Sequence, residues 1–237
     1  MHPIDESNLE TYPQGRDPRF LRVLASQNVV VRQNDGVATD STSHDLYELL
    51  LVWDPGCSIG VLPNDPRLVE RMLSHSEADL LVLVGGNDVG SVAVRDYSES
   101  AALDWAMKNH VPVLAICRGF QMLNLYLGGR IESHLCRLPT QELLHAGSQH
   151  SIQVSKEGVE ILNLHTSEFE VNSFHNHGVA LAGLAPTLTQ LAHSPDGLVE
   201  AAWAVSPRLI GLQWHPERPG APVELSFAIM DWLTTNG

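Results

Sequence analysis

Short apolar runs recur along the first half of the chain, and each is bounded by polar residues, glycine or proline. The runs that we predict to be strands cover residues 28–32, 57–62, 80–84 and 111–116. The last two show no polar alternation, which is typical of strands that are buried on both faces of a sheet.

Between these runs, apolar residues recur at helical spacing. The predicted helices cover residues 44–53, 66–75, 98–109 and 118–127, with Ser98 as the expected N-cap of the third. Strands that alternate with helices predict a mostly parallel central sheet flanked by helices, so the expected fold class is α/β.

The second half of the chain has a different pattern. Shorter, partly alternating runs predict further strands at 152–154, 168–171, 198–205 and 209–214, before a closing helix at 223–234. These runs predict a small β-rich extension of the α/β fold. Residues 1–27 are polar and interrupted by proline and glycine, so we expect an N-terminal arm or active-site loop there and one folded domain over residues 28–237.

Composition limits the classes of partner. The chain has 28 acidic residues against 14 Lys and Arg, and its formal net charge is −14. Such a surface repels nucleic acid and anionic membranes, and no apolar run approaches the ~20 residues needed to cross a bilayer. We expect a small-molecule substrate, with neither nucleic acid nor membrane as a partner, and a homodimer stays open.

The three cysteines are Cys57, Cys117 and Cys136, and they lack the even number and regular spacing of a disulfide framework. Reduced thiols are typical of cytosolic proteins. The acidic N-terminus does not have the pattern of a signal peptide. We therefore expect a cytoplasmic protein in which Cys57 and Cys136 are structural.

Cys117 has a setting that the other two cysteines lack. It follows a predicted buried strand and precedes Arg118, Gly119 and a helix. Side chains at such a junction project from the carboxyl edge of the sheet, and the positive end of the helix stabilises a thiolate. The pattern is that of a nucleophile elbow with cysteine in place of serine, although a small buried core residue would fit the local pattern as well.

A thiol nucleophile needs a base, and the base needs a group that orients it. His215 and Glu217 follow the last predicted strand, two residues apart, and both can project from the same sheet edge. His215 can accept the thiol proton while Glu217 holds its second ring nitrogen. Taken alone, the segment could also be an ordinary surface turn.

Together these segments resemble class I glutamine amidotransferase domains, and most of all the free-standing γ-glutamyl hydrolases of the peptidase C26 type, which include γ-glutamyl-GABA hydrolases. The matching stretches are 83–89, 95–96, 112–124, 127–129, 171–175, 196–201 and 211–217. They run in family order from about residue 28 to the C-terminus, and the ordered set is far more specific than any one motif. The resemblance implies a flavodoxin-like sheet.

The resemblance also implies roles for individual residues. Cys117 would attack the γ-carbonyl and form a glutamyl thioester, His215 would protonate the leaving amine and then activate water, and Glu217 would orient His215. The implied oxyanion hole consists of the backbone N–H groups of Gly86 and Arg118. The implied contacts to the glutamate part involve Gly85, Asn87, Gln121, Ser173, Phe174 and His175.

Two details resemble a narrower branch of the family. The loop from Gly85 to Asp88 and the segment from His175 to Gly178 look more like the branch associated with capsule polysaccharide biosynthesis, which includes the hydrolase of γ-glutamyl-CDP-amidate. Many γ-glutamyl-GABA hydrolases have Gln where this chain has His177. The implied substrate is therefore a γ-glutamyl amine or γ-glutamyl-CDP-amidate.

Two further features have competing interpretations. The histidines at 145, 150, 175 and 177 raise the question of a metal, but they lack the usual spacing of zinc ligands, so we expect neither a metal nor another cofactor. Arg95 is expected just ahead of the helix at 98, where it would either meet a substrate anion or form a surface ion pair.

Three functions are compared. The first is a stand-alone hydrolase that releases glutamate from a γ-glutamyl conjugate, and the second is a glutaminase subunit that supplies ammonia to a separate synthase. The third is a binding protein on the same fold, which the presence of Cys117, His215 and Glu217 disfavours. The sequence shows no fused synthase domain, so we favour the first.

Overall fold

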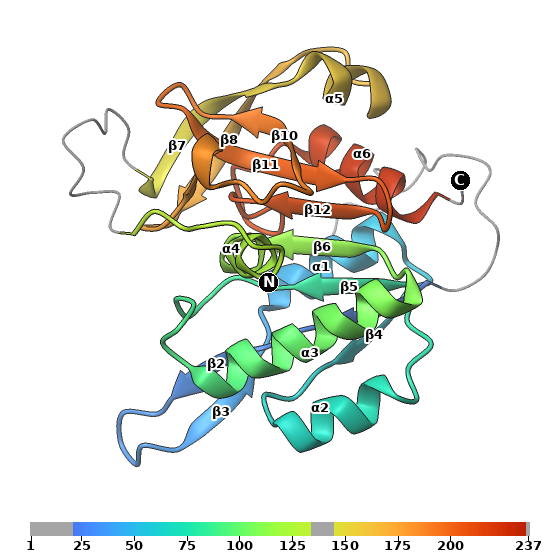
Figure 1. The fold of residues 1–237 in the computed structure, drawn as a ribbon, viewed down its shortest axis with the longest axis vertical. Helices are drawn as coiled ribbons and strands as arrows, with labels where there is room; N and C mark the ends of the chain where they lie inside the picture. Colours follow the sequence, from blue (N-terminus) through green and yellow to red (C-terminus); the bar gives the residue numbers. More distant parts are fainter. Residues whose placement is uncertain (1–20, 134–144, 236–237) are drawn as a thin grey trace, which may run out of the picture.

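The centre of the molecule is a ten-stranded sheet (Figure 1), and the computed structural model describes residues 21–133 and 145–235. The strand order is β4-β1-β5-β6-β12-β11-β10-β7-β8, and β9 pairs with β11. The strands of this sheet are β1 (Arg22–Ala25), β4 (Ser58–Val61), β5 (Leu80–Leu83), β6 (Val113–Ile116), β7 (Ala146–Val154), β8 (Glu168–Phe174), β9 (Val179–Ala180), β10 (Thr189–His193), β11 (Leu198–Ala204) and β12 (Leu209–Leu212).

The sheet has a parallel and an antiparallel half. Strands β4, β1, β5, β6 and β12 pair in parallel, whereas β11, β10, β7 and β8 continue the sheet in antiparallel pairs. The predicted α/β class with a β-rich extension is confirmed, and the extension belongs to the same sheet. A separate hairpin pairs β2 (Asn28–Val31) with β3 (Ala38–Ser41).

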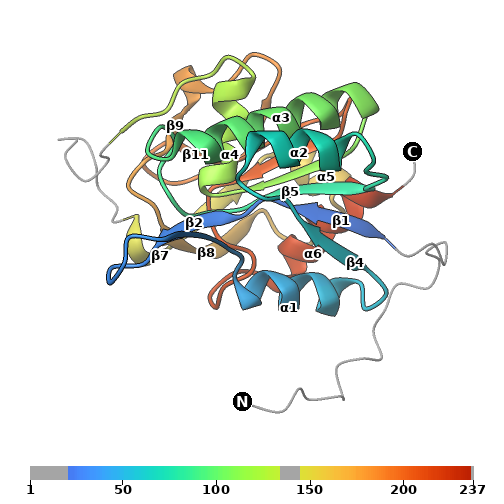
Figure 2. The ribbon, with the colours of Figure 1, turned by 90° about the horizontal axis from the view of Figure 1, so that it is seen from below.

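Helices cover both faces of the sheet (Figure 2). One face carries α2 (Pro66–Leu73), α3 (Ala93–Asn109) and α4 (Arg118–Tyr126), and the other carries α1 (His44–Trp53) and α6 (Val223–Thr234). A short helix, α5 (Lys156–Ile161), follows β7, and a 3₁₀ turn covers Leu181–Gly183.

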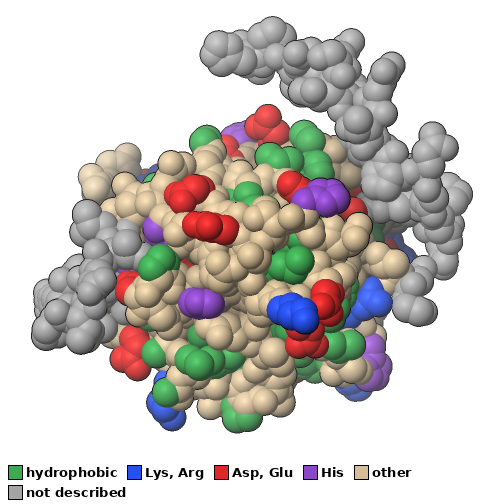
Figure 3. Space-filling model, turned by 90° about the horizontal axis from the view of Figure 1, so that it is seen from above, with side chains coloured by type: hydrophobic (Ala, Val, Ile, Leu, Met, Phe, Trp, Pro, Cys, Tyr) green, Lys and Arg blue, Asp and Glu red, His purple; other side chains and the backbone are tan. Residues whose placement is uncertain are grey.

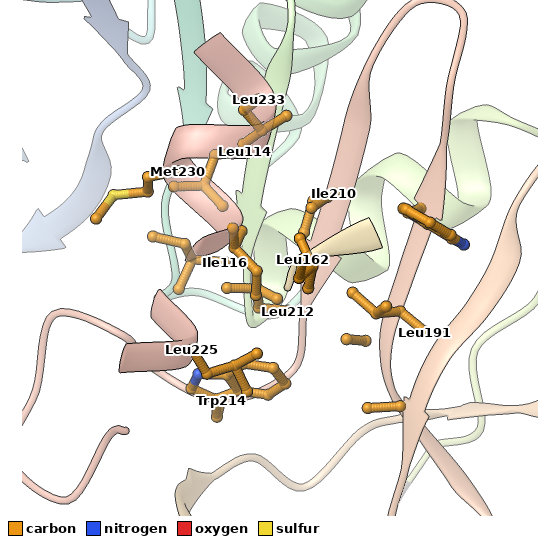
Figure 4. Packing of buried hydrophobic residues seen from close by; sticks show 14 of the residues in the cluster. Leu114, Ile116, Leu162, Leu191, Ile210, Leu212, Trp214, Leu225, Met230 and Leu233 are labelled. Atoms are coloured by element: carbon orange, nitrogen blue, oxygen red, sulfur yellow. The ribbon is translucent and has the colours of Figure 1, made fainter. Parts of the chain in front are cut away.

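Two hydrophobic cores lie on the two faces, and the central strands contribute to both. In β6, Leu114 and Ile116 face the core of α1 and α6, while Val113 and Ala115 face the core of α2, α3 and α4. Figure 4 shows α6 packed on Leu114, Ile116 and neighbouring side chains of β12. This two-sided burial explains the uninterrupted apolar runs in the sequence.

The expected first strand is wrong in its position within the fold. Asn28–Val31 does form a strand, but it belongs to the β2–β3 hairpin, outside the central sheet. The central strand is Arg22–Ala25, which pairs with both β4 and β5. Residues 22–25 are therefore part of the domain and not of an arm. The sequence pattern did not predict this strand, because its apolar run of three residues is too short to stand out by periodicity. Residues 1–20 lie outside the described residues.

The third helix begins earlier than its sequence pattern predicted. It starts at Ala93 with Val92 as its N-cap, and Ser98 lies inside it with its hydroxyl donating to the carbonyl of Val94. The sequence pattern did not predict β10 or α5. Cys57 is half-buried with a free thiol, and Cys136 falls outside the described residues.

The surface agrees with the acidic composition of the chain. On the face drawn in Figure 3, the Lys and Arg side chains of the described residues lie singly or in small groups, with acidic side chains among them. Within the described residues, no helix has the length and apolar character needed to span a membrane.

Candidate active site

Cys117 lies at the turn between β6 and α4. Its backbone has φ +51° and ψ −106°, which is a strained conformation for a residue with a side chain. The side chain is 6% exposed. A sharp strand-to-helix turn of this kind presents the sulfur at the carboxyl edge of the sheet and at the positive end of α4.

Gly119 makes this turn possible by letting α4 approach β5. A Cβ atom at Gly119 would lie 2.3 Å from the carbonyl oxygen of Leu83. No side chain larger than hydrogen fits there, because that oxygen belongs to the backbone of a central strand. The glycine after Cys117 is therefore required by packing at the base of the site.

His215 and Glu217 follow β12, which is the strand next to β6 in the sheet. The Nδ1 atom of His215 lies 2.7 Å from Oε1 of Glu217, and both side chains are nearly buried. The side chain of Cys117 acts on the same imidazole, since it raises the pKa of His215. The structure thus brings together the three residues that the sequence predicted as a set.

The environment of His215 favours its charged form. Burial alone would lower its pKa, but hydrogen bonds to Cys117 and Glu217 and the negative charge of both partners outweigh burial and raise the pKa of His215 to about 9. His215 therefore carries a proton at neutral pH. The charged imidazole has the carboxylate of Glu217 at its Nδ1.

Asn172 fixes the segment that carries His215, a role that sequence analysis did not assign. Its Oδ1 accepts the backbone N–H of His215 at 2.9 Å, and its Nδ2 donates to the carbonyl of His215 at 2.9 Å. The same amide also donates to the carbonyls of Arg218 and Pro219. Asn172 lies within a stretch that matched the family, and that match was the available signal.

The loop after β5 comes close to the imidazole. A Cβ atom at Gly85 would lie 2.7 Å from Cε1 of His215, and Gly86 has φ +121°, a conformation that side chains rarely adopt. Arg118 is the first residue of α4, and N–H groups in the first turn of a helix have no acceptor within it. Both expected oxyanion donors therefore lie on segments that border Cys117 or His215.

Arg95 holds this loop in place, and the surface ion pair, one of the two interpretations of Arg95, is wrong. Its side chain is fully buried, and Nη2 donates to the carbonyls of Val84 and Gly85 at 2.7 and 2.8 Å. Its Nε lies 3.1 Å from Glu99. The helix begins five residues earlier than expected, and this shift turns Arg95 inward.

A second guanidinium joins the same buried network. Arg118 pairs with Glu99 and Asp96, and its Nε donates to the carbonyl of Asn87 at 3.1 Å. Burial lowers the pKa of Arg95 to about 10, while burial and the charge of Arg95 lower that of Arg118 to about 9. Two arginines thus support the glycine loop through its carbonyl oxygens.

The expected glutamate contacts divide into two groups. Gln121 lies at the site, since its Nε2 donates to the carbonyl of His177 at 2.9 Å and contacts Gln213, whose own Nε2 lies 3.7 Å from the sulfur of Cys117. Phe174 is half-exposed, and its ring centroid lies 5.8 Å from that of His215. Gln213 was not assigned a role from sequence.

Three other expected contacts have side chains that interact with other parts of the protein. Asn87 bonds the backbone of Val29 through both its amide atoms, which ties the loop to β2. Ser173 is buried and donates to the carbonyl of His145 at 2.8 Å. His175 is 4% exposed, and its side chain lies in a buried cluster with His145, His150 and Glu200. Their backbone roles stay predictions.

A cavity of about 160 Å³ opens beside Glu217 and the glycine loop. Gly85, Gly86, Glu217 and Arg218 line it on one side, and Ser43 and Leu46 line it on the side of α1. Arg218 is the one cationic side chain among the described residues of its wall, and its guanidinium stacks 5.0 Å from the ring centroid of Phe174.

A separate polar cluster lies behind β8. The side chains of His145, His150, His175 and Glu200 offer ligand atoms that all lie within 4.8 Å of one another. Burial raises the pKa of Glu200 to about 8 and lowers that of His175 to about 3. His177, the fourth histidine considered from sequence, instead contacts Asp88 at 3.2 Å.

The chain matches one protein-family model and is similar to several known proteins. The peptidase C26 family model matches residues 56–217. The protein NtpR of Enterococcus hirae is 36% identical over 66% of this chain and 74% of its own length. The γ-glutamyl-γ-aminobutyrate hydrolase PuuD of Escherichia coli is 34% identical over 73% of this chain and 69% of its own length.

A solved structure supports the fold. A glutamine amidotransferase from Thermotoga maritima superposes with a TM-score of 0.62 at 21% identity, over 83% of this chain and 76% of its own. At that identity the likeness concerns the fold alone. The family match, by contrast, extends from just before β4 to Glu217 and so contains Cys117, His215 and Glu217. The chain belongs to the peptidase C26 family.

Proposed function

We propose that this protein is a cysteine-dependent hydrolase of γ-glutamyl amide bonds that releases glutamate from a small conjugate. The observation that carries the proposal is the grouping around His215: its Nδ1 lies 2.7 Å from Glu217, and Cys117 acts on the same imidazole and raises its pKa. A nucleophile, an acid–base group and an orienting carboxylate in this order are the requirement for covalent acyl transfer.

In the first half of the reaction, the sulfur of Cys117 attacks the γ-carbonyl carbon, and the carbonyl electron pair moves onto oxygen. Collapse of this adduct breaks the C–N bond. His215 donates its proton to the departing nitrogen, which leaves as the neutral amine, and a glutamyl thioester stays on Cys117. The raised pKa of His215 suits this step, because the proton is present at neutral pH.

In the second half, water replaces the amine. Neutral His215 takes a proton from water, and the resulting hydroxide adds to the thioester carbonyl. The C–S bond then breaks, so that glutamate leaves and Cys117 and His215 return to their starting charges. Glu217 stabilises the imidazolium in both halves without itself taking up a proton.

The oxyanion that forms in each half needs donors that are already in place. We assign this role to the backbone N–H groups of Gly86 and Arg118. The buried network of Arg95, Glu99 and Arg118 fixes the loop and the helix terminus that carry them. One such donor lowers the barrier by about 3 kcal/mol.

The two halves of the substrate would lie on opposite sides of the imidazole. Gln121, Gln213 and the backbone of 173–175 are suited to the glutamate part. The cavity by Arg218 is suited to the amine part, and its cation would bind an acidic group there despite the net charge of −14. This arrangement favours conjugates whose amine carries a carboxylate or phosphate.

The relatives support the same reaction class. PuuD is named as a γ-glutamyl-γ-aminobutyrate hydrolase, and it matches over 73% of this chain. γ-Glutamyl-GABA is therefore the first substrate to test, and γ-glutamyl-CDP-amidate, from the narrower resemblance, is the second. Both carry an anionic group on the amine side.

The experiment is glutamate release by the purified chain alone. The panel contains glutamine, γ-glutamyl-GABA, γ-glutamyl-butylamine and γ-glutamyl-CDP-amidate. We expect turnover of an anionic conjugate at least about 10-fold better than of glutamine, since the cavity beside Arg218 adds binding that glutamine cannot use. If glutamine were the one substrate of the panel that is hydrolysed, and only after a synthase is added, the protein would instead be a glutaminase subunit.

A further inference from the structure

Three histidines and one glutamate from distant parts of the chain meet in the interior of the antiparallel half of the sheet. His145 precedes β7, His150 lies within β7, His175 follows β8 and Glu200 lies in β11. Their exposed fractions are 4, 5, 4 and 0%. Nothing in the proposed hydrolysis uses these side chains.

Each imidazole is held by its outer nitrogen. Nε2 of His145 lies 3.0 Å from a carboxylate oxygen of Asp196. Nδ1 of His150 donates to the carbonyl of Ser151 at 3.2 Å, and Nδ1 of His175 donates to the carbonyl of His177 at 2.9 Å. These partners accept hydrogen bonds, so each outer nitrogen carries the hydrogen and each inner nitrogen presents a lone pair.

The inner nitrogens all face one carboxylate oxygen. The distances to Oε1 of Glu200 are 3.8 Å from Nδ1 of His145, 3.6 Å from Nε2 of His150 and 3.9 Å from Nε2 of His175. These separations are too long for hydrogen bonds. Nε2 of His150, Nε2 of His175 and both carboxylate oxygens of Glu200 have no hydrogen-bond partner. Nδ1 of His145 has only a long contact, at 3.5 Å, to the hydroxyl of Ser173, which donates to the carbonyl of His145 instead.

The inner nitrogens and the carboxylate of Glu200 are hydrogen-bond acceptors that surround one point, and none of them faces a donor there. A buried polar group that lacks a partner costs about 1 to 3 kcal/mol, and here four such atoms face one another. A single proton on Glu200 could serve only one of the three nitrogens. A cation at the centre would satisfy all four ligand groups at once.

We propose that His145, His150, His175 and Glu200 bind one zinc ion in a closed structural site. Imidazole nitrogen and carboxylate oxygen are zinc ligands, and four ligands complete a tetrahedron. Zn–N and Zn–O bonds of about 2.0 to 2.2 Å place such ligand atoms about 3.4 Å apart. The observed distances of 3.6 to 3.9 Å to Glu200 reach this geometry with movements of roughly 1 Å or less per side chain.

The outer partners are those expected of a zinc site. Metal-bound histidines usually donate their second N–H to a carboxylate or a backbone carbonyl, and this fixes the ring orientation. All three histidines here have such a partner. The four protein ligands leave no open position for water or substrate, so the ion would stabilise the fold and not take part in the hydrolysis.

The site also lies close to the expected glutamate contacts. The carbonyl of His177 accepts hydrogen bonds from both His175 and Gln121. A zinc ion on His175 would therefore fix the end of β8 and, through this carbonyl, the position of Gln121. The expected effect of the ion on catalysis is indirect.

The test begins with the unmodified protein. Full-length chain is stripped with a chelator, reconstituted with zinc, passed through a desalting column and analysed by elemental mass spectrometry. We expect about one zinc ion per chain and a Tm that rises by roughly 5 to 10 °C with zinc, because binding to the folded state alone stabilises it. Less than about a tenth of an equivalent, with an unchanged Tm, would overturn the proposal.

Variants and a spectroscopic probe locate the ion. Glu200→Gln and His150→Gln are expected to weaken zinc binding about 100-fold or more, while His193→Gln, an exposed histidine in neighbouring β10, should bind as the wild type does. Co²⁺ in the wild-type protein should give the visible spectrum of tetrahedral nitrogen and oxygen ligation. A thiolate charge-transfer band, or equal zinc binding by Glu200→Gln and wild type, would place the metal elsewhere and refute the site. The Co²⁺ measurement decides the question even if a variant does not fold.

Discussion

A Cβ atom at Gly85 would lie 2.7 Å from Cε1 of His215. The loop after β5 therefore touches the Cε1 edge of the imidazole without a side chain between them. Its carbonyls are held by Arg95, so the loop cannot easily move away. The close contact links the glycine loop to the position of His215, the proposed acid–base group.

Gly85→Ala should displace the imidazole and leave the rest of the fold intact. Gly85 has no positive φ, so alanine causes no backbone strain there, and the conflict is with the ring alone. We expect kcat to fall about 100-fold, since a shift of about 1 Å at a reacting group has this effect. Steady-state kinetics with γ-glutamyl-GABA measure it. Gly60→Ala is the control, because its Cβ would meet the flexible end of Leu24 at 3.3 Å and make only an ordinary contact, at 3.9 Å, with the carbonyl of Val23. Unchanged kcat in Gly85→Ala would refute the contact.

Glu217→Gln should change the pH dependence as well as the rate. The pKa of His215 is raised to about 9, so the protonated form is present at neutral pH and is lost as the pH rises through that value. We expect kcat/KM of the wild type to fall on the alkaline side near pH 9. In Glu217→Gln the missing charge should move this limb toward the ordinary value of 6.5, with kcat lower by roughly 10³- to 10⁴-fold.

The control for the pH profile is a carboxylate outside the site. Glu160 is exposed in α5 and pairs with Lys156 at 3.9 Å, so Glu160→Gln should keep the wild-type profile. An alkaline limb that stays in place in Glu217→Gln would show that Glu217 does not set the proton affinity of His215.

Glu99→Ala should destabilise the protein strongly. It would leave Arg95 and Arg118 buried with one carboxylate fewer, and uncompensated buried charge costs about 3 to 5 kcal/mol. Urea unfolding measures the loss. Glu160→Ala, which removes an exposed ion pair at the same i,i+4 spacing, should cost under about 0.5 kcal/mol. A loss below about 1 kcal/mol for Glu99→Ala would mean that the network is not an important part of the fold.

Arg218→Ala should affect substrates according to the charge of the amine. Loss of a charge-assisted contact is expected to raise KM for γ-glutamyl-GABA about 10-fold. KM for γ-glutamyl-butylamine should hardly change, because its amine has no acidic group. Loss of the contact between Arg218 and Phe174 would affect both substrates, so the ratio of their KM values reports the charge effect by itself. An equal rise for both substrates would contradict a role for Arg218 in leaving-group binding.

The sequence predicted the parallel core well because burial on two faces leaves a strong signal. The runs at 80–84 and 111–116 contain β5 and β6. It failed for Arg22–Ala25, whose short apolar run is masked by the polar residues around it. The start of α3 was also misplaced, since Val92 caps the helix without a side-chain hydrogen bond and therefore leaves no sequence signal.

The candidate site also has some residues that the sequence pattern predicts and others that it does not. Cys117, His215 and Glu217 were predictable, because each follows a recognisable strand and two of them are neighbours in sequence. The buried roles of Arg95, Asn172 and Glu200 depend on partners that are far away in the chain. The three clustered histidines lie just before β7, within β7 and just after β8, so no local spacing could have united them with Glu200 in β11.

The most direct test of the account is glutamate release from γ-glutamyl-GABA by three proteins: wild type, Cys117→Ala and Cys57→Ala. Cys57 is the other free cysteine in the described part of the chain, and it makes a matched control. We expect wild type and Cys57→Ala to release glutamate at similar rates, and Cys117→Ala to be slower by at least about 10⁴-fold with its fold intact by circular dichroism. Release by Cys117→Ala at the wild-type rate would contradict the account, because the reaction would then not pass through this sulfur.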